Sequence, residues 1–346
     1  MTHIWLRAEP RAHETRVGLT PDGAAQMIAA GYQITVEDSD DRCIPTAEYV
    51  TAGCATAAAG SWPDAPDDAI IFGLKELPED GTPLRHRHIM FGHAYKGQPS
   101  GRVLLDRFQA GGGTLFDLEY LVDPDGRRIA AFGYWAGYAG AAMSLLAWAA
   151  QQDGGVQADV QGVKDAQDLQ GRIKTALAGH TPSTLIIGAL GRVGTGAADL
   201  CHALGLRVVG WDMAETASGG PFPEVLQHDI FLNCILARPG TPVFVPASTP
   251  TDDRKLTVIG DIACDPDSDF SPIKVYDQAT TWAAPNLRVH DDPPLDVMAI
   301  DNLPSLLPRE SSEDFAGQLL PHLMGLDDLG QGVWGRAKAT FDENTS

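Results

Sequence analysis

Residues 184–196 read TLIIGALGRVGTG, an apolar run that ends in a loop rich in glycine. The run predicts a short buried strand, and Gly188, Gly191 and Gly194 predict a tight turn into a helix over residues 197–204. Such a turn brings backbone N–H groups to the positive end of a helix, where they can bind a pyrophosphate. The spacing is G-x-x-G-x-x-G and not the standard G-x-G-x-x-G, so the loop needs support from its surroundings.

A second apolar run provides that support. Residues 206–211 predict the next strand, which ends at Asp212, 24 positions after Gly188. An acid there accepts hydrogen bonds from an adenosine ribose and repels a 2′-phosphate, which favours NAD over NADP. The alternative is a glycine-rich turn between a strand and a helix, with Asp212 as a helix N-cap. Of the two, we favour NAD binding.

Strands and helices alternate on both sides of this loop, which predicts mostly parallel sheets. The expected fold class is α/β, with two Rossmann-like domains whose parallel sheets flank an interdomain cleft. We expect residues 1–133 to form a substrate and catalytic domain, onto which a C-terminal helix over 320–346 packs back, and residues 134–319 to form the NAD-binding domain. A long helix over 132–152 joins the two. The expected strands are residues 4–6, 33–37, 69–74, 89–92, 114–118, 184–188, 206–211, 230–235 and 256–259.

Two ionisable residues close apolar runs in the first domain: Lys75 follows 69–74, and His93 follows 89–92. In an open α/β sheet, ligands gather outside the carboxyl ends of parallel strands, so both side chains are expected at a ligand site. An amine and an imidazole there could exchange protons with an amine substrate near neutral pH. The alternative is a lysine in a surface ion pair and a histidine satisfied in the core. The neighbours expected to tune the pair are Glu76, Lys96 and Glu119.

Composition limits the partners. The chain has 346 residues, a length that fits about two domains, and a net charge of −21, which argues against nucleic acid or an anionic membrane as a partner. We expect neither a secretory leader nor a membrane-spanning helix, because no apolar stretch is long enough. Five scattered cysteines without a C-x-x-C pair favour a reducing cytoplasm, and we expect a monomer or a small homo-oligomer. No metal site is expected, since no cysteine or acid cluster accompanies His86 and His88.

Arginines gather near the first strand and before residue 129, although the chain as a whole is acidic. We expect them to form a local cationic patch, and arginine forks bind carboxylates with two parallel hydrogen bonds. The alternative is that each is a solvated surface residue. The arginines are Arg7, Arg11, Arg16, Arg127 and Arg128.

Several stretches together resemble a known family. They are residues 6–9 (LRAE), Arg16 with 19–21 (LTP), 73–76 (GLKE), 91–96 (FGHAYK), 118–119 (LE), 126–133 (GRRIAAFG), the loop 188–196, and Asp301 with 303–310 (LPSLLPRE). In these stretches the chain is similar to saccharopine dehydrogenase (NAD, L-lysine-forming), a branch of the alanine dehydrogenase/transhydrogenase-like superfamily. The similarity runs over nearly the whole chain.

The resemblance implies an activity: saccharopine, NAD and water give lysine, 2-oxoglutarate and NADH, reversibly. It implies that Lys75 deprotonates the secondary amine as hydride leaves and that His93 serves water attack and collapse of the imine. The positions matching substrate binding are Arg11, Arg16, Lys75, Arg128 and Phe132. The positions expected to contact the cofactor are Gly188, Gly191, Arg192, Gly194, Asp212, Thr216, Asp301, Asn302 and Leu303.

Two other functions stay open from the sequence. An alanine dehydrogenase-type enzyme, or one acting on another N-carboxyalkyl amino acid, would need fewer or different carboxylate partners. A catalytically silent NAD-binding module would not need both Lys75 and His93. The stretch 152–181 is shorter than in the family and unlike it, which bears on cofactor affinity and substrate preference more than on the chemistry.

Overall fold

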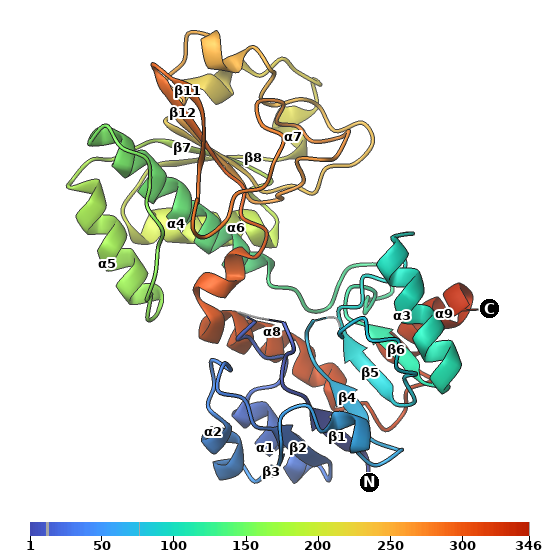
Figure 1. Cartoon of the computed structure of the whole chain (residues 1–346). Helices are drawn as coiled ribbons and strands as arrows, with labels where there is room; N and C mark the ends of the chain where they lie inside the picture. Colours follow the sequence, from blue (N-terminus) through green and yellow to red (C-terminus); the bar gives the residue numbers. More distant parts are fainter. Residues whose placement is uncertain (12–13, 76, 346) are drawn as a thin grey trace. The chain divides into compact units, whose positions relative to one another are not determined.

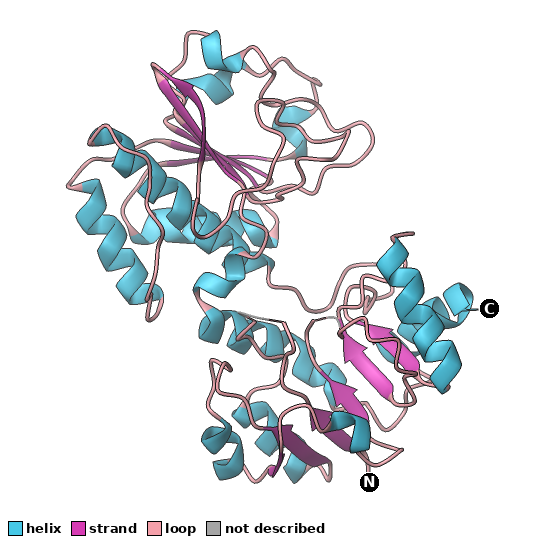
Figure 2. Cartoon of the chain, in the orientation of Figure 1, coloured by secondary structure: helices cyan, strands magenta, loops and turns pink. Residues whose placement is uncertain are grey.

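The computed structural model describes residues 1–11, 14–75 and 77–345, which form two compact units (Figure 1). Unit 1 comprises Met1–Ala131 and Pro308–Ser346, and unit 2 comprises Phe132–Leu307. Each unit contains a mostly parallel sheet with helices packed beside it (Figure 2), so the α/β prediction is confirmed. Among the described residues, no helix is long and apolar enough to cross a membrane.

Unit 1 is built on a sheet in the order β3-β2-β1-β4-β5-β6, in which every pairing between described strands is parallel. Ile70, Ile71 and Phe72 of β4 are fully buried, which is why this strand reads as a continuous apolar run. The strands are β1 (His3–Leu6), β2 (Gln33–Glu37), β3 (Ala55–Ala57), β4 (Ile70–Phe72), β5 (Arg87–Met90) and β6 (Thr114–Asp117). The helices are α1 (Pro21–Ala29), α2 (Thr46–Thr51), η1 (Trp62–Asp64), α3 (Pro99–Gly111), α8 (Pro308–Leu323) and α9 (Gly332–Thr345).

Unit 2 contains the sheet β11-β12-β10-β9-β7-β8, in which only β11 is antiparallel to its neighbour among the described strands. The strands are β7 (Thr184–Ile187), β8 (Val208–Trp211), β9 (Ile230–Asn233), β10 (Val258–Asp261), β11 (Leu287–Asp291) and β12 (Pro294–Met298). The helices are α4 (Gly133–Gln152), α5 (Ala166–Leu177), α6 (Arg192–Ala203), α7 (Met213–Thr216), η2 (Pro223–Gln227), η3 (Thr249–Thr251) and η4 (Leu303–Leu306).

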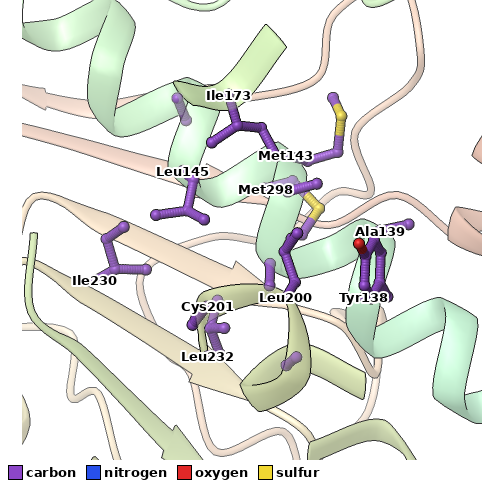
Figure 3. Close-up of a cluster of buried hydrophobic side chains, with 14 of the residues drawn as sticks. Tyr138, Ala139, Met143, Leu145, Ile173, Leu200, Cys201, Ile230, Leu232 and Met298 are labelled. Carbon is purple, nitrogen blue, oxygen red and sulfur yellow. The ribbon is translucent and has the colours of Figure 1, made fainter. Parts of the chain in front are cut away.

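Successive residues of a strand point to opposite faces of its sheet. In the second sheet, side chains on both faces are buried. On one face, Ile230 and Leu232 of β9 belong to a cluster with residues of α4, α5 and α6, and Figure 3 shows Leu145, Leu200 and Ile173 converging there. On the other face, Phe231 packs with Phe222 and Phe244. The strands are therefore held in place from both sides, which fixes the loops at their carboxyl ends.

The observed units differ from the predicted domains at one boundary. The first predicted boundary, after residue 133, lies two residues from the observed one, but the second, after residue 319, falls inside α8. The whole of α8 belongs to unit 1 because its apolar residues are buried there: Phe315 and Leu319 are fully buried, and the Phe315 ring centroid lies 6.0 Å from that of Phe91. The C-terminal segment then continues as α9, so the single helix expected over 320–346 is two helices.

Candidate functional site

Ionisable side chains collect at the carboxyl edge of the first sheet. β4 and β5 are neighbours, and Phe72 pairs with Ile89, so Lys75 and His93 each follow the paired residues at a similar distance along the chain. The ladder continues past the strand ends, since Gly73 N–H donates to the carbonyl of Ile89 at 3.0 Å. The structure thus places Lys75 and His93 after adjacent parallel strands, as their sequence positions predict.

His93 sits in a strained and well-defined position. Its φ of +47° lies in the left-handed region that a side chain rarely adopts, and its ring stacks on Phe91 with centroids 6.3 Å apart. His93 Nδ1 lies 3.4 Å from Oε2 of Glu119, while Lys96 Nζ donates to Oε1 of Glu119 at 2.9 Å. His93 first, and then Lys96 and Arg128, lower the pKa of Glu119 to about 2 against the opposing effect of burial. Glu119 is therefore an anion at neutral pH, next to His93 and Lys96.

Lys75 lies near a buried acid–arginine pair. Arg16 donates to Glu14 through Nε at 2.8 Å and Nη2 at 2.6 Å, and both side chains are almost fully buried. Burial raises the pKa of Glu14, but the hydrogen bond and charge of Arg16, with a smaller effect from the charge of Lys75, lower it overall. The charge of Lys75 thus acts on Glu14, which is bound to Arg16.

The predicted substrate residues differ in their surroundings. Arg16 is buried against Glu14, whereas Arg11 and Arg128 are exposed. Phe132 is the first residue of unit 2 and the N-cap residue of α4. Arg7 departs from the expected local cationic patch, because its buried guanidinium contacts Glu9 and a backbone carbonyl. Glu76 lies outside the described residues. In the described part of the chain, no group of three or more His, Cys, Asp or Glu side chains could hold a metal ion.

Two acids at this edge were missed from the sequence. Glu9 binds the backbone N–H groups of Leu74 and Lys75. Asp117 ends β6 and is fully buried; its Oδ1 accepts from the Glu119 N–H at 2.9 Å, and its Oδ2 accepts no hydrogen bond from the described residues. Burial raises the pKa of Asp117 to about 6. The rule that marked Lys75 and His93 also marks Asp117, since it too ends a parallel strand.

The glycine loop of unit 2 has the geometry of a phosphate cradle. At Gly194 a Cβ atom would lie 2.2 Å from the carbonyl oxygen of Gly188, and Gly188 itself has a φ of +89°, so both positions require glycine. Gly191 is the N-cap residue of α6, with no side-chain cap among the described residues, and a Cβ there would meet nothing closer than 3.4 Å. Packing therefore does not require glycine at this position, and the start of α6 has the form that anion-binding helix ends share.

A pocket of about 420 Å³ lies beside this loop, at the carboxyl ends of β7 and β8. Asp212 and Thr216 line it together with Ile187 and Ile235. Asp212 is also the N-cap residue of α7, accepting from Met213 N–H at 2.9 Å and from Leu190 N–H at 3.1 Å. Both roles weighed for Asp212 are thus compatible with its position. The cradle and the pocket fit the diphosphate and the adenosine of NAD.

The remaining predicted cofactor residues are found at the same edge of the second sheet. Arg192 is the first residue of α6. Asp301, Asn302 and Leu303 follow β12, which runs parallel to β10. Asn302 accepts a hydrogen bond from Trp282 Nε1 at 3.0 Å, and Leu303 is buried. These residues therefore surround the carboxyl ends of the parallel strands, where a ligand is expected.

Comparisons with known proteins agree with this geometry. Residues 5–139 match the family model "Alanine dehydrogenase/PNT, N-terminal domain". The chain is 44% identical to the saccharopine dehydrogenase [NAD(+), L-lysine-forming] of Schizosaccharomyces pombe, covering 98% of this chain and 97% of the relative. The relative of the same name from Neurospora crassa is also 44% identical, over 100% of this chain and 97% of its own length. The chain belongs to the saccharopine dehydrogenase (L-lysine-forming) family.

Solved structures support the fold of this family member. An L-alanine dehydrogenase matches with a TM-score of 0.70 at 18% identity, over 99% of this chain and 94% of that chain. At this identity the match shows the architecture alone. The chain therefore shares the fold of alanine dehydrogenase, and its residues 5–139 match the N-terminal domain of the alanine dehydrogenase/PNT family model.

Proposed function

We propose that this chain catalyses the NAD-dependent oxidative deamination of saccharopine to L-lysine and 2-oxoglutarate, in a reversible reaction. The observation that carries the proposal is the pair Lys75 and His93, which follow adjacent parallel strands in a chain that matches 97% of the length of its relative. NAD, when bound, accepts a hydride from the carbon that carries the substrate amine. The residues of this chain supply the proton transfers and the binding of the substrate.

Lys75 takes the proton from the secondary amine of saccharopine. Glu14 and Arg16 beside it set its electrostatic surroundings. His93 then assists water as it adds to the carbon of the substrate imine, and assists cleavage of the C–N bond of that adduct, which gives 2-oxoglutarate and lysine. Because its Nδ1 faces the Glu119 anion, its Nε2 is the atom that exchanges protons with water. Lys96 neutralises part of the charge of Glu119.

Carboxylates of the substrate are bound by arginines. Arg11 and Arg128 are exposed and can meet a substrate from solvent, and Arg16 is oriented by Glu14. Phe132 provides an apolar contact. A substrate with several carboxylates suits this set better than alanine, which has one, so we prefer saccharopine to alanine or to another N-carboxyalkyl amino acid. The presence of both Lys75 and His93 disfavours a silent NAD-binding module.

Unit 2 carries the cofactor in this proposal. Gly188, Gly191, Arg192 and Gly194 bind the diphosphate, and Asp212 with Thr216 binds the adenosine ribose. Asp301, Asn302 and Leu303 lie on the nicotinamide side. We further propose that the protein acts in the cytoplasm, which its five free thiols support, and that it is a monomer or a small homo-oligomer.

Purified protein tests the proposal directly. With NAD, saccharopine should produce NADH absorbance at 340 nm, whereas alanine should not; the opposite pattern would overturn the assignment. Lys75→Met and His93→Gln should each lower turnover by about 100-fold or more without changing NAD affinity. Lys338→Met is the matched control, because Lys338 is an exposed lysine of α9 that pairs with Asp342. Wild-type turnover in Lys75→Met or His93→Gln would show that the substituted residue has no role in proton transfer.

A further inference from the structure

The backbone of Lys75 is held by two buried charged side chains. Glu9 Oε1 accepts from the N–H of Leu74 at 2.6 Å, and Glu9 Oε2 accepts from the N–H of Lys75 at 3.0 Å. Arg7 Nη2 donates to the carbonyl of Lys75, and Arg7 Nη1 lies 3.2 Å from Glu9 Oε2. One acid and one base, joined to each other, thus bind the N–H and the carbonyl of the same residue. We call these two side chains the Arg7–Glu9 clamp.

The clamp binds the backbone that follows β4, beyond the last residues that pair with β1. β1 pairs with β4 up to Leu6 and Phe72, and Arg7 N–H donates to the carbonyl of Phe72 at 2.9 Å. Beyond that point the chain of β1 turns away, and without Glu9 the N–H groups of Leu74 and Lys75 would lose these acceptors. On the β5 side, Phe91 N–H donates to the carbonyl of Leu74 at 2.9 Å. The chain leading to Lys75 is therefore fixed on both sides.

The clamp is also tightly packed. The side chains of Arg7 and Glu9 are only 1% and 9% exposed. The Arg7 guanidinium lies against Gly73 so closely that a Cβ there would be 2.4 Å from its Cζ, which explains the glycine two residues before Lys75. Hydrogen bonds between charged groups and backbone are strong when they are buried. The hydrogen bonds of both side chains converge on the backbone of Lys75.

We propose that Arg7 and Glu9 are positioning residues that fix the peptide groups of Lys75 and thereby hold its amine where the substrate amine must meet it. The catalytic part of this inference rests on the proposed function of Lys75. Displacement of a reacting group by about 1 Å can cost about 100-fold in rate, so the clamp should affect kcat more than KM. Neither residue touches the substrate in this proposal.

Glu9→Gln is the decisive variant, because an amide oxygen can accept from one of the two N–H groups but its NH₂ group cannot accept from the other. We expect kcat with saccharopine to fall by about 10- to 100-fold, with KM for saccharopine and the affinity for NAD nearly unchanged. We also expect faster hydrogen exchange in the peptide that contains Leu74 and Lys75. Arg7→Lys should give the same pattern, since one ammonium group does not reproduce the fork that joins Glu9 to the Lys75 carbonyl.

Asp229→Asn is the matched control. Asp229 is a half-buried acid of unit 2 that accepts from the N–H of Ser183 at 2.7 Å, just before β9, at the edge of the sheet away from the cofactor loops. The Asp229→Asn variant loses a similar hydrogen bond to a charged carboxylate, but should keep the wild-type kcat. An equal fall in kcat in this variant would mean that general destabilisation, not positioning, explains the effect of Glu9→Gln. That result would overturn the proposal, and so would a wild-type kcat in Glu9→Gln.

Hydrogen exchange separates this inference from the proposed function. If wild-type protein produced no NADH from saccharopine, the proposed function would fail, but faster exchange at Leu74 and Lys75 in Glu9→Gln would still establish the clamp. Unchanged exchange there would refute the clamp whatever the activity. If Glu9→Gln does not fold, Arg7→Lys undergoes the same measurements with the same criteria.

Discussion

Replacing Asp117 by asparagine should change how the stability of the protein depends on pH. Asp117 is fully buried, and burial raises the pKa of its carboxyl from an ordinary 3.8 to about 6. Backbone N–H groups and the charge of His93 act in the opposite direction, but they do not outweigh burial. Asparagine keeps an oxygen that can accept from the Glu119 N–H and removes the titration.

The sign follows from which state holds the proton. Between about pH 4 and pH 6 the folded protein keeps a proton on Asp117 that the unfolded chain releases, so the free energy of unfolding falls as the pH rises through this range. Above pH 6 both states are ionised and the cost of the buried charge is constant. For a folded pKa of about 6, the loss between pH 4.5 and pH 7.5 is about 2 kcal/mol. Asp117→Asn should lack this loss.

Denaturant unfolding of wild type and Asp117→Asn at intervals from pH 4.5 to 7.5 measures the effect. The stability of the variant relative to wild type should rise by about 2 kcal/mol across that range, whatever the constant cost of the substitution. Asp125→Asn, an exposed change of the same atoms, should run parallel to wild type. Parallel curves for wild type and Asp117→Asn would refute the argument, and so would a carboxyl titration of Asp117 centred near pH 4 by NMR.

Three further substitutions test other parts of the structure. Asp212→Ala should lower the preference for NAD over NADP by about tenfold or more, because it removes the acid that lines the adenosine pocket; the ratio of the two dissociation constants measures this. Gly194→Ala should weaken NAD binding by about tenfold or more, since its Cβ would lie 2.2 Å from the Gly188 carbonyl oxygen, as calorimetric titration would show. Ser312→Ala should destabilise unit 1 by about 1–3 kcal/mol in denaturant unfolding, because the buried N–H of Val17 loses its acceptor at 3.0 Å.

Each of these substitutions has a control that changes the same atoms in open surroundings. Asp253→Ala and Ser248→Ala alter exposed side chains, and Gly171→Ala adds a Cβ that meets nothing within 4 Å. An unchanged NAD/NADP ratio in Asp212→Ala would leave the residue with its helix-capping role alone. Wild-type NAD affinity in Gly194→Ala would mean that the loop adjusts. Wild-type stability in Ser312→Ala would mean that the hydrogen bond from Val17 N–H does not contribute to the stability of unit 1.

The sequence predicted the fold and the positions of Lys75 and His93 after two strands because both depend on local pattern. An apolar run that stops at Lys75 or His93 marks the end of a buried strand, and parallel strands bring such ends to one edge. The same pattern at Asp117 was available and was overlooked. Helix α5 could also have been recognised, since Leu169, Ile173 and Leu177 are spaced four residues apart and are all buried.

The Arg7–Glu9 clamp could not be predicted in this way. Its hydrogen bonds join Glu9 to residues 65 and 66 positions later in the chain. No local spacing tells which of the 46 acidic residues of the chain will accept from those N–H groups. The grouping of Arg7 with the other arginines failed because its contacts also join distant parts of the chain. The residue type indicates that arginine can bind a carboxylate, but the packing of Arg7 against Gly73 places its guanidinium on Glu9 and the Lys75 carbonyl.

The buried pair Glu14–Arg16 raises the question of how an arginine already bound to an acid could also bind a substrate carboxylate. Glu14 occupies the Nε and Nη2 side of the guanidinium. A guanidinium carries five N–H groups in a planar fork, and the two hydrogen bonds to Glu14 use only part of these donors. Because Glu14 fixes the plane of the group, less side-chain entropy is lost when a ligand binds. In the proposed function, Glu14 therefore orients Arg16 for a substrate carboxylate instead of competing for it, so a buried ion pair and a substrate site are compatible at the same residue.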